Sequence, residues 1–351
     1  LQPGPEFPKE MMGSGLQEEL DKITDLLHEG LRNSNFNAEM HEGLQDLGIG
    51  TMNLLCEEGR FQGDLHFSSV PPTNLALLPG RMDGVSDWFR WNDYMDITEV
   101  KHRYPKAKYT EKMASEQKRN PKRKTKIVEA TVYDEQDRFK DEYTYYLISE
   151  TDNCILIKER LKGRGSQPWI TTRWSKSGFE VWGRGPVLQA MPAIKTLNLT
   201  VQLILENAEM AIAGSYVYDD DGVFNPDNIT IQPGTFIPRS PGSSIESLQS
   251  AGRFDVAQLV IDDMRRNVRK ALFIDELDTR PNARTPLSAT EVSERLADVA
   301  RDMGAVAGRM QKEFLQPLVE RLIYIYTKQG LLDIPKVDGR ELRIVPVSPL
   351  L

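Results

Sequence analysis

The chain has 351 residues and a formal net charge of −8, and at about 150 residues per domain this length predicts roughly two domains. Hydrophobic residues make up 39% and charged residues 27%, close to the average of globular proteins, and no apolar run approaches the ~18 residues that span a bilayer. The composition therefore predicts a globular protein without a membrane anchor. The two cysteines, Cys56 and Cys154, lie far apart, show no pattern of a disulfide framework or a zinc site, and favour a reducing compartment. The lack of a signal peptide and the first residue, Leu1, indicate a fragment or a processed form.

The first elements are helices. Residues 1–15 contain six Pro and Gly residues and predict an extended lead-in. Apolar residues at helical spacing then predict one helix from Leu16 to Leu31 and a second from Asn37 to Leu47, which would end before Gly48.

Charge is distributed unevenly. Residues Lys101 to Lys126 contain 11 Lys and Arg and two acidic residues, a local charge of +9 that leaves −17 on the remainder. Affinity for nucleic acid comes mainly from Lys and Arg that neutralise phosphates, so the acidic remainder argues against tight, permanent binding of DNA or RNA. Tyr104 and Tyr109 within the stretch could stack on bases or anchor a loop. Three interpretations of the stretch are open: contact with nucleic acid, contact with an acidic scaffold or capsid surface, or a solvated flexible arm.

Between residues 127 and 182 the apolar period is two, which is typical of strands. Loops rich in Asp, Asn, Ser and Gly separate the apolar pieces, so the pattern predicts an antiparallel meander. The expected strands are Ile127–Tyr133, Tyr143–Ser149, Cys154–Lys158, Trp169–Trp174 and Phe179–Trp182.

Two further helices flank a turn-rich segment. Pro186 suits a first helical position, and an apolar face continues to Ala213, where Gly214 would end the helix. A second helix is expected from Phe254 to Phe273, with acidic residues early and basic residues late, as the helix dipole prefers. The segment 215–252 predicts a small β-rich excursion with strand-like pieces at Tyr216–Tyr218, Ile229–Ile231 and Thr235–Ile237.

Some apolar residues of the first of these helices lie outside its main apolar face. They are Leu199, Leu203 and Ile212. An amphipathic helix with a second apolar face can bury that face on a neighbouring subunit or within its own chain, and both alternatives are open.

The last third of the chain begins with a polar loop from Asp275 to Leu287. Ser288 to Glu291 form a capping box, and a helix of roughly 40 residues is expected from Ala289 to Gln329, with a kink at Pro317. A strand is expected from Glu341 to Val347, and the ending without a completed domain indicates truncation.

No motif of a common catalytic site occurs in the sequence. It contains no GxxxxGK[ST] loop, no GxGxxG after a strand, no HExxH and no GxSxG. The four histidines lack metal-ligand spacing, and acidic pairs such as Asp262-Asp263 are typical of solvated charge. The glycine-flanked Arg164 and Arg184 favour turns over phosphate binding. The sequence therefore predicts no enzyme, no cofactor and no metal site.

The order of helix, β-rich excursion, helix, polar loop and long kinked helix resembles the core of bacteriophage portal proteins, the head-to-tail connectors of short-tailed phages. Three local sequences are similar to structural motifs of that family, in the same order. They are Arg32-Asn33-Ser34-Asn35-Phe36 with Gly50-Thr51, Trp182-Gly183-Arg184-Gly185-Pro186 with Ile194-Lys195-Thr196-Leu197-Asn198, and Thr290-Glu291-Val292. The resemblance extends from about Leu16 to Leu351.

The resemblance implies an α+β portal fold that forms rings. Its regions would be a wing of N-terminal helices and β meander (1–185), a first stem helix (186–214), a small β-rich clip (215–252), a second stem helix (253–274), a tunnel loop (275–287), a long wing or crown helix (288–330), and a returning strand ahead of a truncated crown (331–351).

The resemblance also implies where the chain meets its partners. The tunnel loop would face DNA with Asp275, Glu276, Asp278, Arg280, Asn282 and Arg284, and the clip would dock the motor and adaptors with Tyr218, Asp219, Asp220, Asp221, Phe224 and Arg239. The arginines of the tunnel loop would touch phosphates briefly while its acidic residues oppose adhesion, and a solvated connector loop is the alternative. A basic arm would comprise Lys118, Arg119, Lys122, Arg123 and Lys124.

Members of this family assemble as a ring, usually of twelve subunits, at one capsid vertex, where double-stranded DNA enters during packaging and leaves during ejection. The implied partners are copies of the chain, the terminase large subunit, tail adaptor proteins, the major capsid and scaffold proteins, and DNA in transient contact, without a membrane. The implied location is the virion, and the host cytoplasm during assembly. Twelve copies at −8 carry −96, which favours weak contact with DNA. Two alternatives are another oligomeric virion or tail adaptor protein, and a hydrolase with a dispersed carboxylate site.

Overall fold

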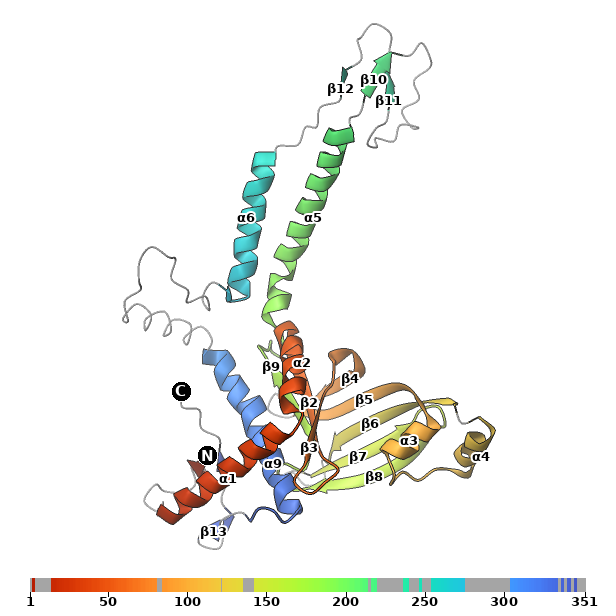
Figure 1. The fold of residues 1–351 in the computed structure, drawn as a ribbon, viewed down its shortest axis with the longest axis vertical. Coiled ribbons are helices and arrows are strands. Elements are labelled where there is room, and N and C mark those ends of the chain that lie inside the picture. Colours follow the sequence, from red (N-terminus) through yellow and green to blue (C-terminus); the bar gives the residue numbers. More distant parts are fainter. Residues whose placement is uncertain are drawn as a thin grey trace. The chain divides into compact units, whose positions relative to one another are not determined.

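Figure 1 shows the computed structural model of the chain, a mixture of helices and strands as the α+β prediction requires. It divides into two compact units, one formed by Leu1–Pro186 with Leu296–Leu351 and the other by Val187–Arg295. The described residues are 2–3, 14–80, 84–120, 122–134, 142–213, 216–219, 236–239, 246–247, 254–274, 304–333, 336–337, 340–341 and 344–345.

The two N-terminal helices are confirmed, as α1 (Ser14–Asn33) and α2 (Phe36–Ile49). Between them, the Asn35 side chain pairs with the main chain of Phe67: its amide donates to the Phe67 carbonyl (2.8 Å), and its oxygen accepts from the Phe67 N–H (2.9 Å). The turn between the helices is therefore fixed to a strand more than 30 residues later, which explains why this local sequence is distinctive.

A three-stranded antiparallel sheet lies beside these helices, with the order β3 (Leu65–Ser69), β2 (Thr51–Glu58), β9 (Trp169–Arg173). Its strands are joined from distant parts of the chain, since β2 and β9 are more than 100 residues apart. The core of this region includes Leu20 and Leu27 from α1, Leu54 and Phe67 from the sheet, and Tyr326 from a C-terminal helix.

The predicted meander is confirmed in part. β6 (Lys124–Tyr133), β7 (Glu142–Ser149) and β8 (Cys154–Lys162) follow one another as expected, but two unpredicted strands extend their sheet, giving the antiparallel order β4-β5-β6-β7-β8. The added strands are β4 (Leu75–Pro79), which follows a 3₁₀ turn at Pro72–Asn74, and β5 (Val85–Asp96).

Two of the expected strands do not belong to this meander. The segment Trp169–Trp174 forms β9, but it pairs with β2 in the other sheet. The strand expected over Phe179–Trp182 is wrong, because this segment is a loop in which Phe179 has a positive φ of 64° and is fully exposed.

The basic stretch is folded onto the five-stranded sheet, between β5 and β6. It forms α3 (Ile97–Arg103) and α4 (Glu111–Arg119). Val100 and Met113 are buried against Ile127 of β6, Leu147 of β7 and Leu156 of β8. A freely solvated arm, one of the open interpretations, is therefore wrong for this stretch.

The second unit contains the expected long helix as α5 (Pro186–Ala213) and a second helix as α6 (Phe254–Ala271). The prediction for α6 extended two residues too far, because Phe273 has a positive φ of 57°. Between the helices a small sheet has the order β11 (Phe236–Arg239), β10 (Tyr216–Asp219), β12 (Glu246–Ser247), which confirms two expected strand pieces; the third, Ile229–Ile231, lies outside the described residues.

The described part of the expected 40-residue helix runs from 304 to Lys328 and ends in α9 (Gln316–Lys328). The interruption expected at Pro317 is a π-helical segment, Gln311–Leu315, directly ahead of α9. Proline cannot donate a main-chain hydrogen bond, and the carbonyl four residues before Pro317, that of Glu313, instead accepts from the Thr172 hydroxyl (3.3 Å).

The strand expected over Glu341–Val347 is confirmed only in part, because 342–343 and 346–347 lie outside the described residues. Two short pieces occupy this region, and they pair with different partners: β14 (Arg340–Glu341) with β13 (Lys336–Val337), and β15 (Ile344–Val345) with β1 (Gln2–Pro3).

Candidate assembly interface

The helical pair of the second unit has more apolar surface than the pair itself covers. α5 starts at Pro186, whose fixed φ suits the first turn of a helix, and it continues for 28 residues. Ile194, Leu197 and Ile204 are half-buried along one side of it. Leu199, Leu203 and Ile212, predicted to lie off this stripe, have 57%, 49% and 87% of their surface exposed.

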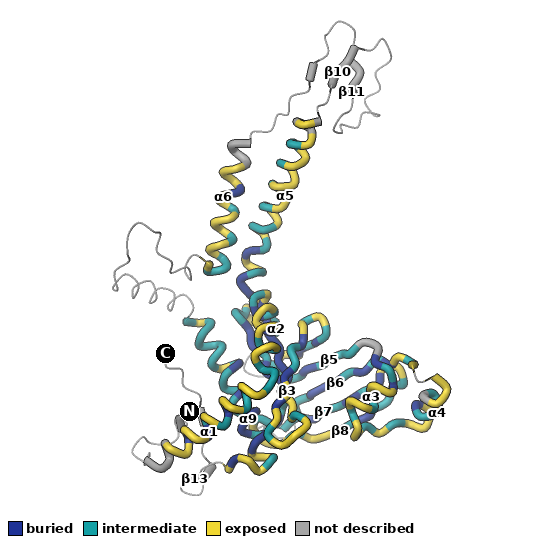
Figure 2. Tube along the Cα trace, in the orientation of Figure 1, coloured by how far each residue is buried: buried dark blue, intermediate teal, exposed yellow. Residues whose placement is uncertain are grey.

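The exposed apolar surface extends beyond those three residues. Leu205, which the periodicity assigns to the main stripe, is 64% exposed, and on α6 Leu259 is 71% exposed while Ile261 is buried. Figure 2 shows α5 as mostly exposed along its length. Apolar side chains gathered on one exposed element are typical of a contact surface for another protein.

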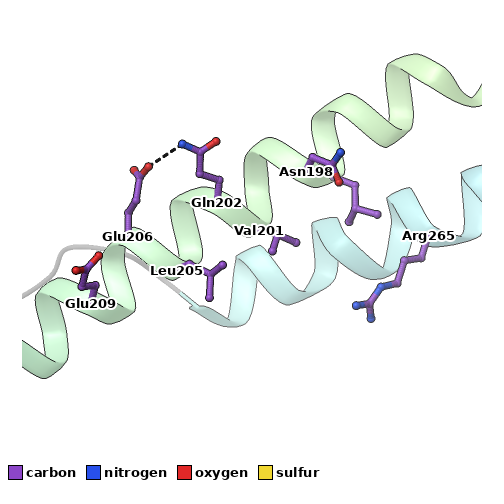
Figure 3. Close-up of a pocket in the computed structure, with 8 residues that line it drawn as sticks. Asn198, Val201, Gln202, Leu205, Glu206, Glu209 and Arg265 are labelled. Carbon is purple, nitrogen blue, oxygen red and sulfur yellow. Dashed lines mark hydrogen bonds between the residues drawn. The ribbon is translucent and has the colours of Figure 1, made fainter.

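A cleft of about 450 Å³ lies between the two helices (Figure 3). Seven of its eight lining residues come from α5, with Arg265 from α6. Leu197, Val201 and Leu205 give it an apolar part, while Gln202 donates to the Glu206 carboxylate (2.8 Å) in its polar part. Apolar and polar side chains mixed in this way are typical of a protein–protein contact.

Comparison with known proteins identifies the family. The model of the family described as bacteriophage head to tail connecting protein matches residues 2–351. The chain belongs to this family. A curated relative of this connector, named "Probable portal protein" from Bordetella phage BPP-1, is 25% identical over 193 residues. That match covers 52% of the connector chain and 34% of the relative, so the chain matches about a third of the relative's length.

The resemblance inferred from the three local motifs is therefore confirmed at the level of the family. Head-to-tail connecting proteins are structural components of the virion. None of the helices in the described part of the connector is long and apolar enough to cross a membrane. The described residues also contain no group of three or more His, Cys, Asp or Glu side chains placed to hold a metal ion.

The long C-terminal helical segment of the connector is tied to the three-stranded sheet by an ion pair. The Arg173 guanidinium on β9 contacts the Glu313 carboxylate at 2.7 and 3.1 Å, and the Arg173 main-chain N–H donates to the same carboxylate (3.0 Å). Arg309 adds a further contact to Glu313 at 3.1 Å. These contacts of Glu313 hold the π-helical segment, which lies directly ahead of Pro317.

A second tie uses Arg321 of α9, which is 7% exposed. Its guanidinium donates to three main-chain carbonyls, those of Cys56 (3.0 Å), Gly165 (3.2 Å) and Ser166 (2.6 Å). Burial also raises the pKa of the Cys56 thiol to about 12, which leaves it protonated and unreactive at neutral pH. Sequence reasoning missed Arg321, because its partners come from two distant segments of main chain.

The glycines around Arg164 and Arg184 lie in loops, as predicted. The structure also shows why three of these positions are glycine. Gly165 has a φ of +73°, and a side chain there would meet the main chain of Glu320. A side chain at Gly183 or Gly185 would meet the main chain of residues 48–50. Both loops therefore need glycine because two segments of main chain approach closely.

The two tyrosines of the basic stretch anchor it. Tyr104 hydrogen-bonds through its hydroxyl to the buried Glu129 carboxylate, and the Lys101 ammonium lies over the Tyr109 ring, 4.9 Å from its centre. Of the residues assigned to the basic arm, Arg123 pairs with Glu116 and with Asp152 (3.3 Å). The other four, Lys118, Arg119, Lys122 and Lys124, are exposed.

The remaining predicted contact residues are brought together only in part. In the small sheet Asp219 and Arg239 are direct partners of the parallel pair β10–β11, and Tyr218 is the partner of Pro238. The predicted clip residues Asp220, Asp221 and Phe224 lie outside the described residues, as do all six tunnel-loop residues, Asp275, Glu276, Asp278, Arg280, Asn282 and Arg284.

A polar groove in the first unit was not predicted. Glu57 of β2 lines it together with Arg90 and Arg103. Burial by the groove walls, and then the negative charge of Glu129, raise the pKa of the Glu57 carboxyl. Glu129 is held by Tyr104, by Asn92 (3.2 Å) and by Arg90 (3.9 Å). The groove thus places the exposed Glu57 carboxyl next to the buried carboxylate of Glu129 on the other sheet.

Proposed function

We propose that this connector is a subunit of a portal ring, set at one vertex of a phage capsid, through which double-stranded DNA passes during packaging and ejection. The observation that carries the proposal is the apolar surface on α5 and α6 that a single subunit leaves exposed, in a chain whose family match covers residues 2–351. A heterologous contact between such surfaces gives a ring when the rotation between neighbours closes.

The parts of the ring would follow the order of the chain. Residues 1–185 would form the wing, 186–214 and 253–274 the stem helices, 215–252 the clip, and 275–287 the tunnel loop. Residues 288–330 would form the long wing or crown helix, and 331–351 its returning strand. The helices α5 and α6 on either side of a small sheet support this assignment, because a stem-and-clip arrangement needs two helices joined by a compact β-rich segment.

The charge of the chain suits a conduit. A chain of −8 in about twelve copies repels the DNA phosphates overall, so passing DNA would make weak contacts that ions screen. Tight binding would require a surplus of Lys and Arg along the path of the duplex, and the largest local surplus lies in the stretch 101–126. A polymer that must move in both directions is served by such weak contact.

The clip would serve as the docking platform for the terminase large subunit during packaging and for tail adaptors afterwards. The wing would face the major capsid and scaffold proteins, and assembly would take place in the host cytoplasm before the ring becomes part of the virion. The name of the phage relative, a portal protein, supports this set of partners.

The experiment that tests the proposal is the mass and rotational symmetry of the purified chain, by native mass spectrometry and negative-stain class averages. A closed ring of about twelve subunits with a central hole is expected. A monomer or a symmetric dimer at every protein concentration, in both this chain and the longest natural form of the protein, would contradict it.

A further inference from the structure

One end of the first unit has a strongly basic surface. It consists of Lys108, Lys112, Lys118, Arg119, Lys122 and Lys124, all exposed, on α4 and the segments that flank it. We call this set the α4 surface. None of these six side chains forms an ion pair with another residue that the structure describes.

The α4 surface has a fixed shape. The Met113 sulfur of α4 lies 3.7 Å from the Cys154 sulfur at the start of β8, and Met113 is buried. The Thr110 side chain caps α4 by accepting from the Met113 N–H, and the Lys108 N–H donates to the Leu156 carbonyl of β8 (2.8 Å). A surface whose main chain is already held in place loses less conformational freedom when it meets a partner than a flexible arm does.

An acidic surface lies at the opposite end of the same unit. Figure 1 places α1 and α4 at the two ends of the first unit. One face of α1 is buried through Leu20, Ile23 and Leu27. Its solvent side carries the exposed acidic residues Glu18, Glu19, Asp25 and Glu29, which we call the α1 surface, and none of these pairs with a cation among the described residues.

We propose that the α4 surface of one subunit docks on the α1 surface of its neighbour, a second copy of this chain. This inference rests on the proposed ring. Surfaces of opposite charge at opposite ends of one unit cannot meet within one chain, but they can meet between copies arranged head to tail, and such a contact gives a ring when the rotation between neighbours closes. An acidic remainder of −17 disfavours duplex DNA as the main occupant of the α4 surface, since the flanking surface repels phosphates.

The contact would mainly set the register and the rate of assembly. At physiological ionic strength the Debye length is about 8 Å, so these charges act at short range, when two subunits are already close. Complementary charge then favours the head-to-tail orientation over others. The apolar surface of α5 and α6 would supply most of the stability of the contact between neighbours.

The test uses two charge-reversed versions of the chain. Variant A carries Lys112→Glu, Lys118→Glu, Arg119→Glu and Lys122→Glu, which change its α4 surface from +6 to −2, so both of its surfaces are acidic. Variant B carries Glu18→Lys, Asp25→Lys and Glu29→Lys, so both of its surfaces are basic. Each variant alone should assemble at a protein concentration at least about tenfold higher than the parent chain, because neighbours now repel each other. An equimolar mixture should form rings at the parent concentration, with the two variants alternating.

A third variant serves as the matched control. Lys158→Glu, Arg160→Glu and Lys162→Glu reverse three exposed cations on β8 of the same unit, outside the α4 surface, and should leave the assembly concentration unchanged. Circular dichroism would establish that all variants are folded. Native mass spectrometry of the mixture, with one variant isotopically labelled, gives the ratio of A to B in each ring.

The outcomes separate this inference from the proposed ring. If the parent chain forms rings and variant A forms them equally well, the inference is wrong and the ring stands. If A and B fail alone and their mixture also fails, direct contact between the two surfaces is wrong. If variant A forms rings normally but no longer shifts a short DNA duplex that the parent shifts, the α4 surface binds DNA and the inference is overturned. If neither the parent chain nor the longest natural form of the protein forms rings, the proposed function is wrong, and this inference is wrong with it.

Discussion

The two units of the connector differ in how completely each buries its own apolar residues. In the first unit α1, β2 and α9 contribute Leu20, Leu54 and Ile325 to a shared core in which each of these side chains is fully covered. In the second unit α5 and α6 leave Leu205 and Leu259 largely in water. The first unit therefore covers its apolar side chains within one chain, whereas α5 and α6 carry apolar side chains that the described residues leave exposed.

Ion pairs and hydrogen bonds show the same contrast. In the first unit the Arg173–Glu313 pair and the bonds of Arg321 join segments more than 100 residues apart. In α6 the charged pairs Arg265–Asp262 and Arg266–Asp263 join residues three apart on an exposed helix. Local exposed pairs of this kind contribute little to stability, so these pairs of α6 add less than the long-range contacts of the first unit.

The largest expected effect is the loss of Arg321. Arg321→Leu replaces the guanidinium by an apolar group and leaves the carbonyls of Cys56, Gly165 and Ser166 buried without their donor. Unpaired buried polar groups cost about 1–3 kcal/mol each before relaxation, so the free energy of unfolding should fall by about 3 kcal/mol or more. Urea denaturation followed by circular dichroism measures it.

The matched control is Arg164→Leu. Arg164 belongs to the same contact between the loop and α9, but its ion pair with Glu320 is partly exposed. Its removal should cost less than about 1 kcal/mol. Equal losses for the two variants would contradict the contrast between buried and exposed contacts.

A smaller loss is expected from Gly185→Ala. The added methyl group would meet the main chain of Gly48 and Ile49, which cannot move like the end of a flexible side chain. Forcing atoms into a packed region costs about 1–3 kcal/mol, and the melting temperature should fall accordingly. Gly178→Ala is the control, because a methyl group there meets nothing within 4 Å and a loop Gly→Ala change lowers the entropy of the unfolded chain; a similar fall for Gly178→Ala would show that close approach does not decide the result.

The sequence predicts most of the helices but not which strands belong to which sheet. α1, α2, α5 and α6 each carry an apolar period of 3.6 that is readable within one segment. The period of two in β9 is equally visible, but its pairing with β2 depends on partners more than 100 residues away. The apolar pattern of a strand does not show which other strand it pairs with, so the sequence places β9 in the wrong sheet.

The candidate interface was predictable only in part, for the same reason. Leu199 and Leu203 could be recognised as lying off the main apolar face because a helical face follows from spacing alone, but their exposure in a single chain could not. The basic stretch could not be assigned, because its composition fits a flexible arm as well as a folded surface. The decisive feature was Met113, a single apolar residue in a charged segment, which the structure buries against the sheet.

A small pH effect is expected at Glu57 in the polar groove. Its raised pKa means that the folded state holds this proton more tightly than the unfolded state. The stability that Glu57 contributes therefore falls as pH rises from its ordinary carboxyl pKa through the raised value. Glu57→Gln, which stays neutral, should be more stable than the parent at pH 7 by less than about 1 kcal/mol, because water reaches the groove and screens the repulsion.

The advantage of Glu57→Gln should vanish at about pH 4, where Glu57 is protonated in both states of the parent. Thermal unfolding at pH 4, 5.5 and 7 follows this trend. Glu58→Gln is the neighbouring control: it removes an exposed ion pair with Lys328 (2.6 Å) and should destabilise slightly. An advantage of Glu57→Gln that grows toward low pH would have the wrong sign and would exclude this explanation.

The smallest effect on the unfolding of the isolated chain is expected on α5, where the effect on assembly should be largest. Leu199→Ser with Leu203→Ser removes apolar surface that a single subunit leaves in water, so its free energy of unfolding should change by less than about 0.5 kcal/mol. If a neighbour covers these side chains, each loses about 1.5 kcal/mol or more of burial per interface, and rings should require much higher protein concentration. Ile155→Ser on β8, equally exposed but in the first unit, should leave both quantities unchanged. A double variant that unfolds more easily as a monomer would show that α5 is buried within its own chain, and the contrast between the two units would then fail.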